Sequence, residues 1–166
     1  MFQSRLSKRI DELSVIARQC VAAVCFERYC EFHRLENPDI SAFIDHIWLV
    51  GKLDPDHFED WERGFQMLRA SGWGEDLPED VLKTIPLPIR QEYIKLAGYV
   101  IETSAATWYG SDLKGTKKYL LKVIHIVSTY GIKIPDFESF KAASPQSSGW
   151  GNNPSAEELH AWRYQS

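Results

Sequence analysis

Apolar residues recur at intervals of three and four along most of this 166-residue chain. This spacing lines one face of an α-helix, whereas a strand needs apolar and polar residues to alternate, which Val, Ile and Thr never do here over a strand-length window. The pattern predicts an all-α protein, a single-domain bundle of five or six main helices over residues 1–166. The predicted helices cover residues 6–35, 39–50, 55–70, 76–83, 89–109, 113–130 and 155–163, with a helical turn at 136–142 and a loop over 144–154.

Proline marks two of the helix boundaries. Asn37-Pro38 ends the first helix, because proline disfavours helical geometry in the residue before it. Asp54-Pro55-Asp56 supplies the third helix with an N-cap, a proline at its first position and an early carboxylate. The helix over 39–50 has little polar surface, so we expect it at the centre of the bundle.

Composition narrows the class of protein. With 44% apolar residues, a chain of this size can bury a core without disulfides or metals. Its net charge of −4 argues against general nucleic-acid binding, which needs a basic face to displace counterions from phosphates. The sequence has neither the apolar core of a signal peptide nor a membrane-spanning stretch, so we expect a cytoplasmic protein with no membrane partner.

Three cysteines, Cys20, Cys25 and Cys30, repeat every five residues in the first predicted helix. Successive thiols are therefore rotated by roughly 140° about the helix axis and point to different faces. They cannot bridge one another or share a metal, and we expect them to be buried and reduced.

The segment from residue 54 to residue 80 is strongly acidic, with nine carboxylates against two arginines. Several of these acids fall near predicted helix starts, where they complement free N–H groups and the helix dipole. The acids left over are Glu59, Asp60 and Glu62, on the solvent side of the third helix, and Glu75 in the following loop. We interpret these four as a surface that attracts a basic partner; the alternative is an ordinary solvated face.

Two tryptophans, Trp73 and Trp150, each lie between two glycines. Such an indole either packs back onto the bundle or stays available as an anchor for a partner. We include Trp73 in the predicted partner-binding surface because it adjoins the acidic helix. A second candidate surface is the stripe formed by Lys114, Lys118 and Lys122, for which a solvated outer face is the simpler explanation.

The first helix carries Glu27, Arg28 and Glu31 on or beside its apolar face. An internal salt-bridge network reaching Asp45 or His46 would satisfy them, and Glu27, Glu31, Asp45 and His46 around a metal would make a helical-bundle enzyme instead. The Glu-x-x-His spacing of such enzymes occurs once, near the C-terminus, and neither a Gly-x-Ser-x-Gly elbow nor a phosphate-binding glycine loop is present. We therefore predict no catalytic residue, no metal site and no cofactor.

Two segments resemble parts of known bacterial helical proteins. The stretch 92–110, ending in Trp108-Tyr109-Gly110, is similar to the central helix of small all-helical immunity proteins from polymorphic-toxin and contact-dependent inhibition systems. The opening segment through Cys25-Phe26-Glu27-Arg28-Tyr29 is similar to an uncharacterised bacterial helical family.

The resemblance implies a non-catalytic protein that binds a cognate protein toxin, often a basic nuclease, and blocks its active site. It assigns no functional residue, and nothing in the pattern sets an oligomeric state. The alternatives from other classes are the helical-bundle metalloenzyme and an adaptor protein of a larger bacterial assembly.

Overall fold

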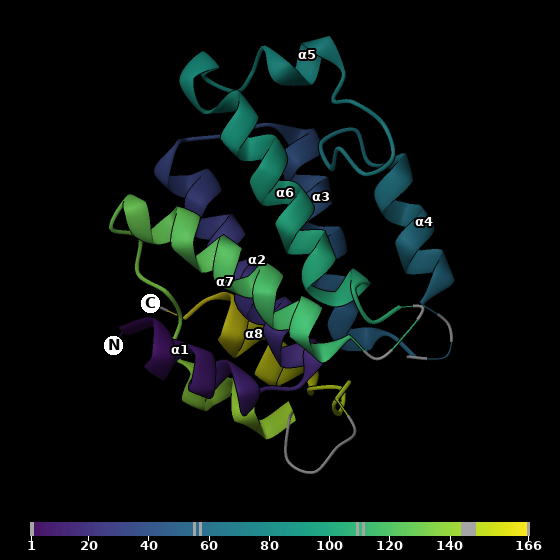
Figure 1. The fold of residues 1–166 in the computed structure, drawn as a ribbon. Helices are drawn as coiled ribbons and strands as arrows, with labels where there is room; N and C mark the ends of the chain where they lie inside the picture. Colours follow the sequence, from purple (N-terminus) through teal and green to yellow (C-terminus); the bar gives the residue numbers. More distant parts are fainter. Residues whose placement is uncertain are drawn as a thin grey trace.

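The computed structural model describes residues 2–54, 56, 58–108, 110, 112–143 and 149–165. Throughout these residues the regular elements are helical (Figure 1). None of the described helices is long and apolar enough to cross a membrane. The α-helices are α1 (Phe2–Asp11), α2 (Val15–Phe32), α3 (Pro38–Trp48), α4 (Glu59–Met67), α5 (Glu79–Leu82), α6 (Arg90–Ala105), α7 (Leu113–Thr129) and α8 (Ala156–Arg163), with 3-10 turns η1 (Leu49–Lys52), η3 (Leu87–Ile89) and η4 (Phe137–Ala143).

The all-α prediction is confirmed, but the number of main helices differs from the predicted five or six. The described residues form eight α-helices, of which α5 is a single turn. The C-terminal helix begins at Ala156, one residue after its predicted start, because Ser155 is its N-cap and forms a capping box with Glu158. Of the predicted loop over 144–154, residues 144–148 lie outside the described part of the chain.

The helix predicted over 6–35 is two helices, because the chain turns between Asp11 and Val15. Ser14 adopts an extended conformation and its hydroxyl accepts a hydrogen bond from the Ala17 N–H, which makes it the N-cap of α2. The N–H groups of Val15 and Ile16 donate to the carbonyls of Gly149 and Trp150. A segment near the C-terminus thus satisfies the first N–H groups of α2, which no local pattern reveals.

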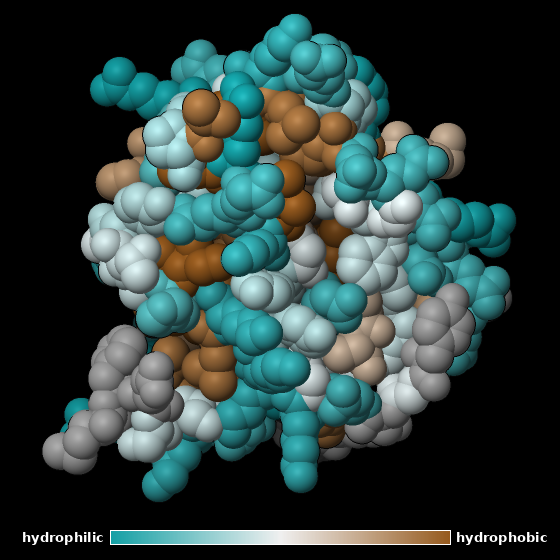
Figure 2. All heavy atoms as spheres, turned by 45° about the horizontal axis from the view of Figure 1, so that its top comes forward, coloured by the Kyte–Doolittle hydropathy of each residue, from teal (hydrophilic) through white to brown (hydrophobic). Residues whose placement is uncertain are grey.

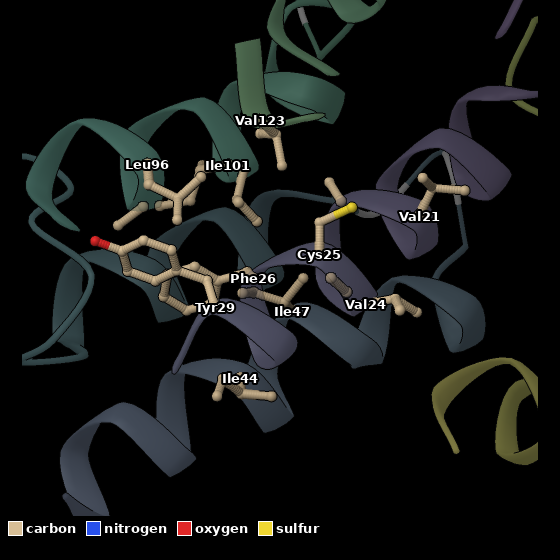
Figure 3. Close-up of a cluster of buried hydrophobic side chains, with 14 of the residues drawn as sticks. Val21, Val24, Cys25, Phe26, Tyr29, Ile44, Ile47, Leu96, Ile101 and Val123 are labelled. Atoms are coloured by element: carbon tan, nitrogen blue, oxygen red, sulfur yellow. The ribbon is translucent and has the colours of Figure 1, made fainter. Parts of the chain in front are cut away.

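α2 occupies the centre of the bundle, so the prediction that the helix over 39–50 is central is wrong. Every residue of α2 from Val15 to Phe26 is buried, and α2 packs against α3, α6, α7 and α8. Figure 3 shows its side chains meeting those of α3, α6 and α7. α3 instead flanks α2 and buries one face, with Phe43 and Ile47 fully enclosed.

The cysteine prediction is confirmed within this core. Cys20, Cys25 and Cys30 are all buried and free. Burial raises the pKa of the Cys25 thiol to about 12, and it raises the pKa values of Cys20 and Cys30 further. All three thiols therefore stay protonated at neutral pH and act as small apolar side chains.

Two polar side chains of α2 reach its neighbours through backbone carbonyls. The Arg18 guanidinium donates to the carbonyls of Leu13 and Leu113 and to the hydroxyl of Thr116, which ties the start of α2 to the start of α7. The Gln19 amide donates to the Val100 carbonyl of α6 at 2.9 Å. These bonds offset the cost of burying polar groups in the packed interior.

The predicted salt-bridge network among Glu27, Arg28 and Glu31 is wrong in its members, because the cation that binds Glu27 comes from another helix. Arg163 of α8 binds Glu27 of α2 at 3.0 Å and Asp45 of α3 at 2.7 Å. Arg28 instead donates to the carbonyls of Lys133 and Gln165, and Glu31 is exposed. Arg163 therefore fastens α8 across the two helices that it covers.

We predict that Arg163→Met lowers the free energy of unfolding at pH 7 by about 1–3 kcal/mol, less than for a fully buried pair. The variant leaves Glu27, whose side chain is only 17% exposed, without its cation. Burial already raises the pKa of Glu27, and the loss of Arg163 raises it further. The destabilisation is therefore present above this raised pKa and shrinks as the pH falls through it, because a protonated Glu27 needs no partner.

Urea unfolding at pH values from 4 to 8 measures this effect, with Arg63→Met as the matched control. Arg63 also pairs with a carboxylate, Asp60, but both side chains are exposed, so its loss should change stability by less than about 0.5 kcal/mol. Adding Glu27→Gln to Arg163→Met should restore part of the lost stability. Equal, pH-independent effects of the two arginine variants would show that Arg163 does not hold α8 in place.

Candidate partner-binding surface

α4, which carries most of the predicted partner-binding residues, is held on α3 by a reciprocal pair of hydrogen bonds. The indole Nε1 of Trp61 donates to the carbonyl of His46 at 2.8 Å, and the Nε2 of His46 lies 2.7 Å from the carbonyl of Trp61. Because a carbonyl only accepts, Nε2 carries the proton. Burial lowers the pKa of His46, which keeps this ring neutral.

Gly64 allows the close approach of the two helices. A Cβ at this position would overlap the His46 ring, which is itself fixed by its bond to Trp61 and by its contact with Phe65 at 4.7 Å between ring centroids. The orientation of α4, and with it the direction in which its acids face, therefore depends on the absence of a side chain at Gly64.

The other support of α4 is Trp108, which follows α6. Among the described residues, four aromatic rings lie within 6.4 Å of the Trp108 ring, measured between centroids. They are Phe58, Trp61, Phe65 and Trp73. Trp61 and Phe65 of α4 are buried, while Phe58 and Leu68, which flank the helix, are half-buried.

The acids of α4 lie in its first turn, which corrects the predicted start of this helix. α4 begins at Glu59, not after Asp54, and the residue before it, Phe58, provides no side-chain cap. Glu59, Asp60 and Glu62 therefore stabilise the free N–H groups of the first turn. The sequence predicts that Asp54 and Asp56 stabilise the start of this helix. Glu59, Asp60 and Glu62, the acids predicted to bind a partner, instead provide part of this stabilisation.

Exposure still leaves these acids accessible to a partner. Glu59 and Asp60 are exposed and Glu62 is half-buried. Asp60 pairs with Arg63 at 3.3 Å, but its side chain is 91% exposed, so the pair contributes little.

Three other acids of the segment are engaged within the protein. Arg69 binds Asp80 and also Asp39 of α3, and it lowers the pKa of Asp80. Glu79 pairs with Lys83 one turn later. The Asp54 carboxylate accepts the N–H of Asp56.

Trp73, Glu75 and Asp76 form the second part of the candidate surface, beyond the other end of α4. Trp73 is half-buried, with its ring 6.1 Å from that of Trp108, so it both packs on the bundle and keeps an exposed edge. It lines a hollow of about 110 Å³ together with Met67 and the two acids. Glu75 and Asp76 are both exposed.

Sequence reasoning missed Met67, whose side chain is 83% exposed, the most exposed of the large apolar residues described. It is the last residue of α4 and lies beside Trp73 in the hollow. Met67 lies two residues after Phe65, on nearly the opposite side of the helical wheel and off the buried arc, and this was the available signal. A flexible thioether at such a point is a common anchor in adaptable interfaces.

Other large apolar side chains are also exposed, among them Leu87, Tyr164 and Phe32. On the face shown in Figure 2, hydrophobic side chains emerge in small areas separated by hydrophilic ones. The other tryptophan between glycines, Trp150, is half-buried, and its backbone carbonyl caps α2. It has a structural role that Trp73 lacks.

Of the residues named for a metal site, Glu27, Glu31 and Asp45 line one hollow, but His46 does not. Glu27 and Asp45 both bind Arg163, whereas His46 faces α4. Within the described residues, no group of three or more His, Cys, Asp or Glu side chains is arranged to hold a metal ion.

The predicted lysine stripe is divided by its surroundings. Lys114 is exposed, and Lys118 lies over the Tyr119 ring. Lys122 lies over Tyr99 of α6 and Tyr119 of α7. Lys122 lines a groove between these two helices.

Compared with protein families, curated proteins and solved structures, the chain matches none of them. The case for a function therefore depends on the geometry of this chain alone.

We predict that Gly64→Ala lowers the free energy of unfolding by about 1–3 kcal/mol, because the new methyl group forces α4 away from His46. Gly98→Ala is the matched control: Gly98 is also inside a helix, α6, but no atom lies within 4 Å of its added Cβ. This control should be neutral or stabilising by about 0.5–1 kcal/mol. Thermal unfolding monitored by circular dichroism measures both, and similar values for the two variants would contradict the close contact.

Proposed function

We propose that this chain is a non-catalytic binding protein of the immunity type, which binds a basic bacterial toxin in the cytoplasm and neutralises it. The observation that supports the proposal is the pairing of charge and apolar surface along α4. Its first turn presents Glu59 and Asp60 to solvent, and its last residue, Met67, projects beside Trp73, Glu75 and Asp76.

The two parts of this surface suit different steps of binding. Exposed acids of one sign attract a basic partner and raise its association rate, but they add little to the lifetime of the complex. Buried aromatic and thioether side chains dominate the lifetime, because they lose contact with water only in the final complex. A basic nuclease, with its cationic substrate-binding face, has the complementary charge.

Neutralising the acidic turn should slow the association. We predict that the triple variant Glu59→Gln, Asp60→Asn, Glu62→Gln reduces the association rate constant at low salt by about tenfold or more, and that added salt removes the difference. The measurement is surface plasmon resonance with the toxin domain encoded beside the gene for this chain.

The matched control replaces Glu31, Glu36 and Glu157 by Gln. These acids are also exposed, and their loss changes the net charge equally, but they lie away from α4. The α4 variant also removes the favourable interaction of these acids with the dipole of α4, which contributes about 0.3–1 kcal/mol of stability per charge. The melting temperatures of the two triple variants are therefore compared first. Equal association rates for the two triple variants would leave the α4 acids with a structural role only.

The lifetime of the complex should depend on Met67. We predict that Met67→Gln raises the dissociation rate constant at least about fivefold, equivalent to about 1 kcal/mol, without changing the stability of the free protein. Leu87→Gln is the control, because Leu87 is 72% exposed on η3. Trp73→Ala should also raise the dissociation rate constant. Because Trp73 contacts Trp108, this variant should lower the stability of the free protein as well.

A measurement of the activity of the bound toxin distinguishes a neutralising protein from an adaptor. A neutralising protein abolishes the activity of the bound toxin at one equivalent, whereas an adaptor binds its partner and leaves the activity intact. Binding that is unaffected by both the α4 and the Met67 variants would place the interface elsewhere.

A further inference from the structure

A groove of about 540 Å³ lies between α6 and α7. No residue of the partner-binding surface on α4 and around Trp73 lines it. From α6 it is lined by Glu92, Lys95 and Tyr99, which share one helix face at intervals of three and four. From α7 it is lined by Lys122 and His125, likewise on one face. Its volume falls within the range of small-molecule sites, about 300–1,000 Å³.

The lysine at the centre of the groove is held in place by aromatic rings. The Nζ of Lys122 lies 4.9 Å from the ring centroid of Tyr99 and 5.5 Å from that of Tyr119. These cation–π contacts span both helices and orient the ammonium group without neutralising it. In the described part of the chain, no carboxylate lies within ion-pair distance of Lys95, Lys122 or His125.

The one carboxylate of the groove is already bound from within the protein. Oε1 of Glu92 accepts hydrogen bonds from the hydroxyls of Tyr29 of α2, at 2.9 Å, and of Tyr130. The hydrogen bond to Glu92 raises the pKa of Tyr130 to about 12, and burial together with the hydrogen bond to Glu92 raises the pKa of Tyr29. Both tyrosines therefore stay protonated and keep donating to Glu92 at neutral pH. The two lysines leave the groove with a net positive charge.

Part of the groove wall is apolar. Leu121 and Ile126 of α7 line it and are half-buried, as is the Tyr99 ring of α6. These groups offer contact area to an apolar or aromatic body, while the ammonium groups can only donate hydrogen bonds, which an anion accepts.

We propose that this groove binds a small organic anion, a carboxylate or phosphate on an apolar or aromatic body. The anionic group is bound by Lys95 and Lys122, with His125 as a further donor, and the body packs on Tyr99, Leu121 and Ile126. This site is independent of the partner-binding surface on α4, since it shares no residue with it.

The test is a titration of the ¹⁵N-labelled full chain with phenyl phosphate, followed by amide chemical shifts in NMR spectra. Benzoate is the second anionic probe, benzyl alcohol is the neutral probe, and inorganic phosphate is the anion without a body. We expect saturable shifts centred on residues 92–99 of α6 and 121–126 of α7 with phenyl phosphate or benzoate. Benzyl alcohol and inorganic phosphate should each bind at least tenfold more weakly than the better of these two.

Single substitutions test whether the lysines of the groove bind the anion. Lys122→Met keeps an apolar stem over the two tyrosine rings but removes the charge, and it should weaken binding of the better probe at least tenfold. Lys114→Met is the matched control on the same helix, exposed and outside the groove, and should bind like the original chain. Lys95→Met provides a second test at an exposed position of α6, where folding is not at risk.

Several results would overturn the proposal. One is that neither anionic probe binds, and another is that the largest shifts lie outside α6 and α7. Equal binding of benzyl alcohol would show an apolar site without anion selectivity. Equal binding of inorganic phosphate would remove the role of the walls, and unchanged affinity in both Lys95→Met and Lys122→Met would remove the role of the lysines.

Discussion

The burial of α2 on all sides is the constraint from which the rest of the structure follows. A helix enclosed from Val15 to Phe26 has no solvent-facing side, so its polar groups must find partners in the helices around it. Arg18 and Gln19 do so through carbonyls of neighbouring segments, and the first N–H groups through carbonyls at residues 149–150. Each of these bonds fixes the position of a surrounding helix and thereby limits the arrangements the bundle can adopt.

The positions of the two candidate binding regions, the groove between α6 and α7 and the surface on α4, follow from this packing. α6 and α7 both pack on α2 and on each other, and the groove lies between them. Glu92 links that groove to the core, because Tyr29 of α2 donates to it. α4 stands further out, attached to α3 and to Trp108, so its acids and Met67 can face solvent without disturbing the centre.

Local sequence signals were sufficient for most helices. α7 begins at Leu113 and ends at Thr129, within one residue of its prediction, because its apolar period is a short-range feature. The same holds for the capping box at Ser155 and for the buried cysteines, which need only the apolar character of their neighbours. Among the site residues, the exposure of Glu59 and Asp60 was also predictable, since they lie off the apolar arc of α4.

What the sequence by itself determined is therefore the helical class and most helix positions, because the periodicity and caps that set them act within one or two turns. Tertiary structure alone decided which helix is central, where α2 begins and which cation binds Glu27. It also assigned the α4 acids to a first turn and placed Lys122 over Tyr99. Each of these depends on a contact between distant segments or on the arrangement of whole helices, and the energy of such contacts leaves no periodic trace in the local sequence.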